Sequence, residues 1–146
     1  MIMTEKIQDM FSLDVSTVVC PVNLQGVMGN GLAVYCKNRY KGLESFYRFA
    51  CKSGMLAYGK CCSYPLSDSK NVLLVPTKIN WRNDSTLDIV EMALMDIWLR
   101  HDVLSIKSLA IPAIGCGKGK LKYDDVRVLL RRYLNTVDIP VHICLT

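Results

Sequence analysis

TVVCPVNLQGVMGNG, residues 17–31, joins an apolar run to a glycine-rich loop. The run from Thr17 to Val22 is rich in β-branched residues, which predicts a buried strand. Gly26, Gly29 and Gly31 then allow positive φ values and let backbone N–H groups come close to a ligand. A strand that ends in such a loop is typical of α/β proteins that hold phosphate groups.

A second loop repeats this arrangement further along the chain. LAIPAIGCGKG, residues 109–119, runs from another predicted buried strand (109–114) into a loop with three glycines. The carboxyl ends of parallel strands lie at one edge of a sheet, where α/β proteins bind their ligands. We therefore expect the two loops to hold the phosphates of a nucleotide-like diphosphate from opposite sides.

The rest of the chain alternates between predicted strands and helices. Apolar spacing predicts strands over 60–64, 71–75 and 140–144, and helices over 32–38, 43–53, 87–98 and 124–134. We expect Asn83, Asp84 or Ser85 to cap the third helix and Asp124-Asp125 to open the fourth. This alternation predicts one α/β domain over residues 1–146, with a largely parallel sheet covered by helices on both faces.

The composition favours a soluble globular protein in a reducing compartment. The formal net charge of +5 permits a polyanionic partner without requiring one. Seven cysteines with no Cys-x-x-Cys pair predict free thiols and no metal site. Residues 1–10 lack the apolar core of a signal peptide and no run is long enough to cross a membrane, so we expect a cytoplasmic location.

Two common nucleotide-binding motifs are absent. Gly26, Gly29 and Gly31 are spaced Gly-x-x-Gly-x-Gly, whereas dinucleotide-binding loops need Gly-x-Gly-x-x-Gly. No Gly-Lys-Ser/Thr follows a glycine and four spacer residues, as a P-loop requires. These spacings disfavour a kinase and a standard dinucleotide dehydrogenase.

A third segment, VPTKINWRN (75–83), lies between a predicted strand and a predicted helix and so belongs to the same edge of the sheet. With the two loops, it resembles the macrodomain family, in particular the DarG-type branch (DNA ADP-ribosyl glycohydrolase antitoxins). The matching pieces are VN with GVMGNGLA (22–23 and 26–33), PTK with WR (76–78 and 81–82), and IPAIGCG (111–117). The resemblance implies a three-layer α/β/α macrodomain with a mixed, mostly parallel sheet.

The resemblance also implies a site for ADP-ribose that needs no metal and no other cofactor. Asp9 matches the residue that accepts a hydrogen bond from the adenine amino group; the alternative is an ordinary surface aspartate. Asn23 matches the residue that faces the distal ribose; the alternative is an Asx-turn that closes the strand. For Lys118 we favour the alternative of a solvated loop lysine. The implied ADP-ribose contacts are Asp9, Gly26, Val27, Met28, Gly29, Gly31, Thr77, Ile114, Gly115, Cys116, Gly117, Lys118 and Gly119.

Lys78 is the residue on which we expect the chemistry to depend. Breaking an N-glycosidic bond is helped by protonation of the leaving group or by nucleophilic capture of the sugar. A lysine beside the anomeric carbon can donate a proton, or attack the opened sugar as an amine. In the DarG-type branch a lysine at this position is essential, and Asn23 would orient the sugar. Trp81 is either a hinge aromatic or a platform on which a base of the substrate stacks.

These expectations lead to a monomeric ADP-ribosyl glycohydrolase with no membrane partner, acting on ADP-ribosylated nucleic acid, first of all thymine-linked ADP-ribose in DNA. Two alternatives stay open. One is a phosphatase for ADP-ribose 1″-phosphate, which would favour a histidine or carboxylate beside the first loop. The other is a reader that binds ADP-ribose without cleaving it. Cys20, Lys120 and Tyr123 depart from the family pattern at positions that bear on the substrate.

Overall fold

A six-stranded sheet forms the centre of the computed structural model, which describes residues 3–146. The strand order is β1-β6-β5-β2-β4-β3. β3 pairs antiparallel with β4, and the other pairings are parallel. This confirms the predicted mixed, mostly parallel sheet. The strands are β1 (Met3–Ile7), β2 (Thr17–Asn23), β3 (Cys62–Pro65), β4 (Asn71–Lys78), β5 (Leu109–Pro112) and β6 (Val141–Leu145).

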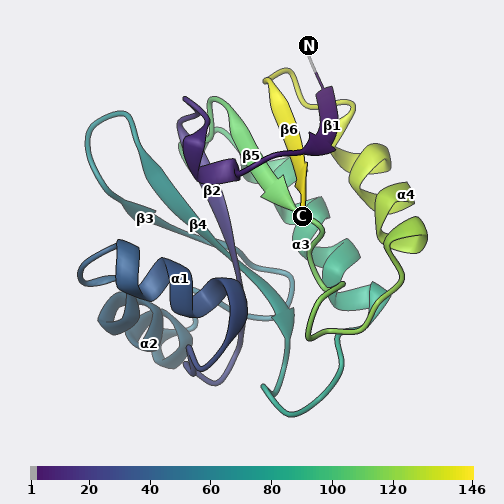
Figure 1. Cartoon of the computed structure of the whole chain (residues 1–146). Coiled ribbons are helices and arrows are strands. Elements are labelled where there is room, and N and C mark those ends of the chain that lie inside the picture. The colour runs from purple at the N-terminus through teal and green to yellow at the C-terminus, as the bar shows by residue number, and fades with distance from the viewer. Residues whose placement is uncertain (1–2) are drawn as a thin grey trace.

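Helices cover both faces of the sheet, as Figure 1 shows. Side chains alternate between the faces along each central strand: Val19 packs on the side of α3 and α4, and Cys20 packs on the side of α1 and α2. Each face therefore has its own apolar core, and the predicted three layers are confirmed. The helices are α1 (Gly31–Arg39), α2 (Leu43–Ser53), α3 (Leu87–Arg100) and α4 (Tyr123–Leu134), with a 3-10 turn η1 (Met10–Ser12).

Two predictions about the strands are wrong. The first strand, β1, was not predicted, because Met3–Ile7 is short and contains a charged residue, Glu5. In the structure, arginine side chains of α4 form ion pairs with Glu5. The strand predicted over 71–75 ends too early, because β4 continues through Lys78 and includes the first residues of the 75–83 segment. Pro76 is tolerated there because the register with β2 shifts between Val22 and Asn23.

The predicted helix caps also differ from the structure. Thr86, and none of residues 83–85, caps α3: its hydroxyl oxygen accepts a hydrogen bond from the N–H of Ile89 at 3.2 Å. α4 begins at Tyr123, so Asp124 lies in its first turn. The helix starts themselves agree with the prediction to within one residue, since α3 begins at Leu87 and the first turn of α4 contains both Asp124 and Asp125.

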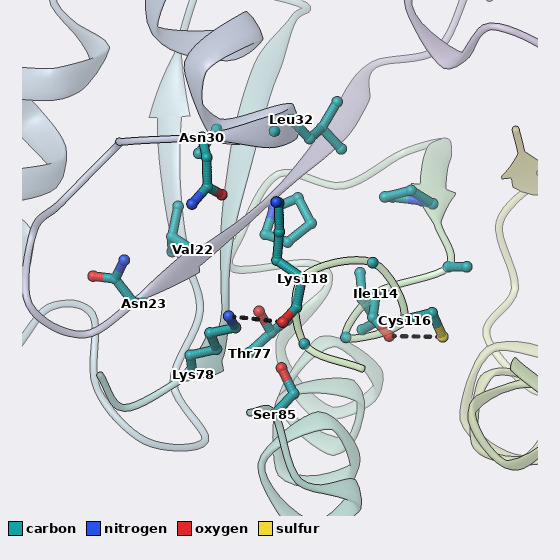
Figure 2. A pocket seen from close by; sticks show the side chains of 18 of the residues that line it. Val22, Asn23, Asn30, Leu32, Thr77, Lys78, Ser85, Ile114, Cys116 and Lys118 are labelled. Atoms are coloured by element: carbon teal, nitrogen blue, oxygen red, sulfur yellow. Dashed lines mark hydrogen bonds between the residues drawn. The ribbon is translucent and has the colours of Figure 1, made fainter. Parts of the chain in front are cut away.

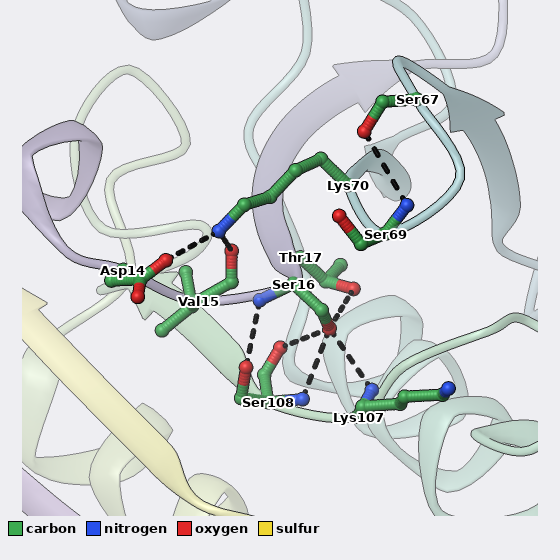
Figure 3. Close-up of polar contacts among 9 residues, drawn as sticks. All are labelled: Asp14, Val15, Ser16, Thr17, Ser67, Ser69, Lys70, Lys107 and Ser108. Atoms are coloured by element: carbon green, nitrogen blue, oxygen red, sulfur yellow. Dashed lines mark hydrogen bonds and ion pairs between the residues drawn. The ribbon is translucent and has the colours of Figure 1, made fainter.

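The amino ends of the central strands are joined by a closed polar network (Figure 3). The Ser16 hydroxyl lies 3.0 Å from the N–H groups of Lys107 and Ser108. Lys70 donates to the Asp14 carboxylate at 2.7 Å and to the Val15 carbonyl at 2.8 Å. Because these polar groups pair with one another, this edge of the sheet is structural.

Two further features bear on the predictions from composition. All seven cysteines are free thiols, and the adjacent Cys61 and Cys62 pack into opposite cores. None of the helices in residues 3–146 has the length and apolar character that crossing a bilayer requires.

Candidate functional site

A cavity of about 690 Å³ opens at the carboxyl edge of the sheet (Figure 2). Its walls include the ends of four parallel strands, at Asn23 of β2, Lys78 of β4, Pro112 of β5 and Cys144 of β6. The volume falls in the range of about 300–1,000 Å³ that small-molecule sites occupy. Both glycine loops and the 75–83 segment contribute to this one cavity, as the sequence predicts.

The first glycine loop forms the wall next to α1. Gly26 and Gly31 have positive φ values of 82° and 61°, which a side chain would oppose. Residues 29–33 line the cavity, so the amino end of α1 faces it. The unpaired N–H groups and the dipole of a helix start favour an anionic ligand.

The second glycine loop forms the opposite wall. All residues from Ile114 to Gly119 line the cavity. The turn is closed by hydrogen bonds from the Leu121 N–H to the Gly115 carbonyl at 2.9 Å and from the Lys120 N–H to the Gly117 carbonyl at 3.1 Å. At Gly117 an added Cβ would meet nothing within 4 Å, so the loop presents bare backbone to the cavity.

Lys78 joins the two walls. It is the last residue of β4, and its Nζ donates a hydrogen bond to the carbonyl oxygen of Lys118 in the second loop at 3.1 Å, as Figure 2 shows. On the other side, the Lys78 carbonyl accepts the N–H of Leu24 at 3.0 Å. The ammonium carries three donors. One of them is held by the Lys118 carbonyl, which keeps the ammonium in the cavity against the second loop.

Asn23 closes β2 with its own side chain. Its Oδ1 accepts the N–H of Gln25 at 3.0 Å, which is an Asx-turn, and its Nδ2 donates to the Val27 carbonyl at 2.9 Å. The buried Tyr47 hydroxyl lies 2.8 Å from Oδ1, and burial raises the pKa of this phenol. The alternative of an Asx-turn is thus realised, while the residue also lines the cavity and retains one N–H of its amide.

Three residues from the predicted set do not line the cavity. Gly26 lies against Arg48 of α2, and Met28 is buried in the core under α1 and α2. Asp9 is exposed and caps η1 by accepting the Phe11 N–H at 3.0 Å. The Cys144 thiol, which lines the cavity, has its pKa raised to about 11, first by burial and then by the charge of the Asp9 carboxylate. The remaining predicted residues all line the cavity: Asn23, Val27, Gly29, Gly31, Thr77, Lys78, Trp81 and the residues from Ile114 to Gly119.

Ser85 is a cavity residue that the sequence predicted only as a helix cap. Its N–H donates to the Gly119 carbonyl at 3.0 Å, and its side chain is turned toward the second loop in Figure 2. Its Oγ is buried and has no hydrogen-bond partner among the described residues. No local sequence pattern indicated that Ser85 lines the cavity, because its contact with Gly119 joins distant parts of the chain.

The fold and the cavity define an α/β protein with a site for an anionic, nucleotide-like ligand between two glycine loops. The chain belongs to the Macro domain family, whose model matches residues 19–130. This match, with both loops and the 75–83 segment inside it, confirms the resemblance seen in the sequence.

Two solved structures of macrodomain proteins resemble this chain over nearly its whole length. The structure of Thermosipho africanus DarTG in complex with ADP-ribose superposes with a TM-score of 0.94 at 35% identity, over 99% of this chain and 42% of that one. The macrodomain of Thermus aquaticus DarG superposes with a TM-score of 0.90 at 28% identity, over 98% of this chain and 97% of that one.

A curated protein from Thermosipho africanus, named DNA ADP-ribosyl transferase-DNA ADP-ribosyl glycohydrolase fusion protein, is 36% identical over 94% of this chain. The chain spans only 40% of the length of that protein. The comparison therefore concerns the macrodomain part of a longer relative.

Proposed function

We propose that this chain binds ADP-ribose in the cavity and hydrolyses the bond between ADP-ribose and a nucleobase, with thymine-linked ADP-ribose in DNA as the substrate. The observation that carries the proposal is the position of Lys78, whose ammonium lies between the two glycine loops and is held by the Lys118 carbonyl. A site that only binds a diphosphate does not need an amine at this junction.

Two comparisons support the ligand and the reaction. The DarTG structure named above contains ADP-ribose, and the curated relative is named a DNA ADP-ribosyl glycohydrolase in its fused form. On our assignment, the start of α1 and residues 115–119 hold the diphosphate from two sides. Asp9 would accept from the adenine amino group, and the free N–H of the Asn23 amide would face the distal ribose.

Lys78 would act on the anomeric carbon of that ribose. In hydrolysis, water adds to the anomeric carbon, the bond to the base nitrogen breaks, and the base leaves with a proton. The Lys78 ammonium can supply that proton. As an amine it can instead attack the anomeric carbon of the ring-opened sugar; the bond to the base nitrogen then breaks, the base leaves with a proton, and water hydrolyses the resulting lysine imine to the sugar aldehyde and the free amine.

The first test is release of ADP-ribose from single-stranded DNA that is ADP-ribosylated on thymine. We expect Lys78→Ala to reduce kcat at least a hundredfold, the lower end of the usual contribution of about 10²–10⁴ for such a group. The affinity for free ADP-ribose, measured by calorimetry, should change less than about threefold, because the diphosphate contacts lie elsewhere. Lys107→Ala, at the opposite edge of the sheet, is the matched control.

The possible results separate the alternatives. Wild-type turnover by Lys78→Ala would disprove the role of Lys78. Tight binding of ADP-ribose with no release from any substrate would indicate a reader, and release of phosphate from ADP-ribose 1″-phosphate alone would indicate a phosphatase. Trapping of a Lys78 adduct by borohydride would favour the amine route over proton donation.

A further inference from the structure

A second, smaller cavity of about 290 Å³ adjoins the main one on the outer side of Lys78. We call it the annex. It shares residues of both loops with the main cavity, so a substrate could extend from one into the other. Its lining contains four cationic side chains and one carboxylate: Asn30, Lys78, Trp81, Arg82, Asn83, Asp84, Lys118 and Lys120.

Trp81 and Arg82 stand at the tip of a turn in the annex wall. The Asn83 N–H donates to the Asn80 carbonyl at 3.1 Å, which closes this turn. The Trp81 N–H donates to the Gln25 side chain at 3.2 Å and so ties the turn to the first loop. Trp81 is 44% exposed, so a ligand in the annex can reach its side chain.

The Trp81 ring is paired with a cation. The Arg82 guanidinium lies 4.9 Å from the ring centroid. Proteins that bind single-stranded nucleic acids combine an aromatic face, on which a base stacks, with cations that contact the backbone phosphates. An acidic peptide would use the cations but would leave the exposed indole without a partner.

Lys120 adds a cation at a backbone position that disfavours a side chain. Its φ of 65° is in the left-handed region, which costs a residue other than glycine free energy. Its ion pair with Asp84, at 3.8 Å, joins two exposed side chains and contributes little. The charge of Lys120 is therefore largely free to contact an anionic group of a ligand in the annex.

We propose that the annex binds the nucleotides that flank the ADP-ribosylated base in single-stranded DNA. A flanking base stacks on Trp81, and the phosphates beside it contact Arg82 and Lys120. This inference rests on the proposed function and adds to it that the enzyme reads the strand as well as the ADP-ribose. Efficient turnover therefore requires more of the substrate than the modified nucleoside.

The test compares two substrates: ADP-ribosylated thymidine, which has no flanking phosphate, and the same modified thymine within a short single-stranded oligonucleotide. For Trp81→Ala we expect kcat/KM on the oligonucleotide to fall about tenfold more than on the nucleoside, as loss of one stacked base predicts. The nucleoside serves as the reference because Trp81 also lines the main cavity. Lys107→Ala, which removes a distant charge, should leave both values unchanged.

Lys120→Gly is a second variant. It should fold as well as the wild type, because glycine readily adopts the φ of 65° found at this position. With the oligonucleotide, the slope of log kcat/KM against log salt concentration should become less negative by about 0.7, the value for one lost contact to a single strand. The nucleoside should show no such change.

Other results would overturn the inference. Equal losses on nucleoside and oligonucleotide would show that Trp81 acts in the main cavity alone, and losses only on an ADP-ribosylated peptide would assign the annex to a polypeptide. If the wild-type protein cleaves neither substrate, the proposed function fails separately. In that case, fluorescence anisotropy measures binding of an unmodified DNA single strand to the protein. Binding that Lys120→Gly weakens would support the annex as a DNA site, and absence of binding by the wild type would refute it.

Discussion

Glycine at position 119 is dictated by its neighbours and not by backbone dihedrals. A Cβ there would overlap the Ser85 hydroxyl and the Gly115 carbonyl oxygen, which lie directly against the loop. Gly117, two residues earlier, faces open space. The same residue type therefore serves the packing of the loop at one position and access of the ligand at the other.

This contrast predicts opposite behaviour for two variants. Gly119→Ala should lower the free energy of unfolding by about 1–3 kcal/mol, the usual cost of overpacking, because the neighbouring backbone must move. Gly117→Glu should leave stability within about 0.5 kcal/mol, as for surface substitutions, but should abolish ADP-ribose binding by placing a carboxylate where phosphates are expected.

Urea unfolding and calorimetry with ADP-ribose measure the two effects. If Gly117→Glu bound ADP-ribose normally, residues 115–119 would not contact the diphosphate. If Gly119→Ala were as stable as the wild type, the loop would be able to rearrange around Ser85.

At the scale of the elements, the start of α3 determines how the 75–83 segment meets the second loop. Thr86 caps the helix, while its neighbour Ser85 donates its N–H to Gly119. The helix start and the cavity wall are therefore set by adjacent residues with different partners. A substitution of Thr86 should therefore lower the stability of the helix start directly, and it should affect the cavity wall only by moving the backbone of Ser85.

We predict that Thr86→Ala lowers the free energy of unfolding by about 1 kcal/mol, because the N–H of Ile89 loses its acceptor. Thr86→Ser keeps the oxygen and should keep most of the stability. Urea denaturation of the two variants beside the wild type measures the difference. Equal stability of all three proteins would show that the cap contributes nothing to folding.

For the whole molecule, Glu5 connects the two ends of the chain. It lies on the edge strand β1 and accepts hydrogen bonds from Tyr123 at 2.5 Å, Arg127 at 2.9 Å and Arg131 at 2.5 Å, all on α4. The Tyr123 hydroxyl and the two guanidinium groups lower the pKa of Glu5 to about 2, although burial opposes this. The carboxylate thus stabilises the folded state in its charged form.

A pH dependence of stability follows. Because the pKa is lower in the folded state, the contribution of Glu5 is complete above its ordinary value of 4.5 and is lost as the pH falls toward 2. At pH 7, Glu5→Gln should cost about 1–3 kcal/mol, as for hydrogen bonds to a charged group. The cost should shrink between pH 4.5 and pH 2.

Urea unfolding of the wild type and Glu5→Gln at several pH values measures this change. Glu44→Gln is the control, because Glu44 pairs with Lys37 and Arg48 at the surface of α1 and α2 and should contribute less than about 1 kcal/mol. A cost of Glu5→Gln that does not vary with pH would contradict the argument.

The sequence alone was sufficient for the class of fold. Residues 17–22 form an apolar run rich in β-branched side chains and residues 109–114 form an apolar run, and a parallel strand that is buried on both faces needs an apolar composition wherever it occurs. The apolar spacing of α2 and α4 likewise depends only on residues within one helix. These are local properties, and the structure and the family match confirm what they predict.

The site was partly predictable for the same reason. Two glycine loops at strand ends must meet at one edge of a parallel sheet, so their shared cavity follows from local patterns. Residues beyond the loops were harder to place. Ser85 was predicted as a cap and lines the cavity, whereas Met28 was predicted as a contact and is buried in the core.

The sequence by itself determined the helices and the strands other than β1, the order of the motifs and the edge of the sheet where they gather, because each depends on residues that are neighbours in the chain. Only the tertiary structure decided that the Lys118 carbonyl holds Lys78, that Ser85 packs under Gly119, and that Glu5 makes β1 a strand of the sheet. These contacts join residues dozens of positions apart. Their geometry exists only after the layers have packed, and no local pattern encodes it.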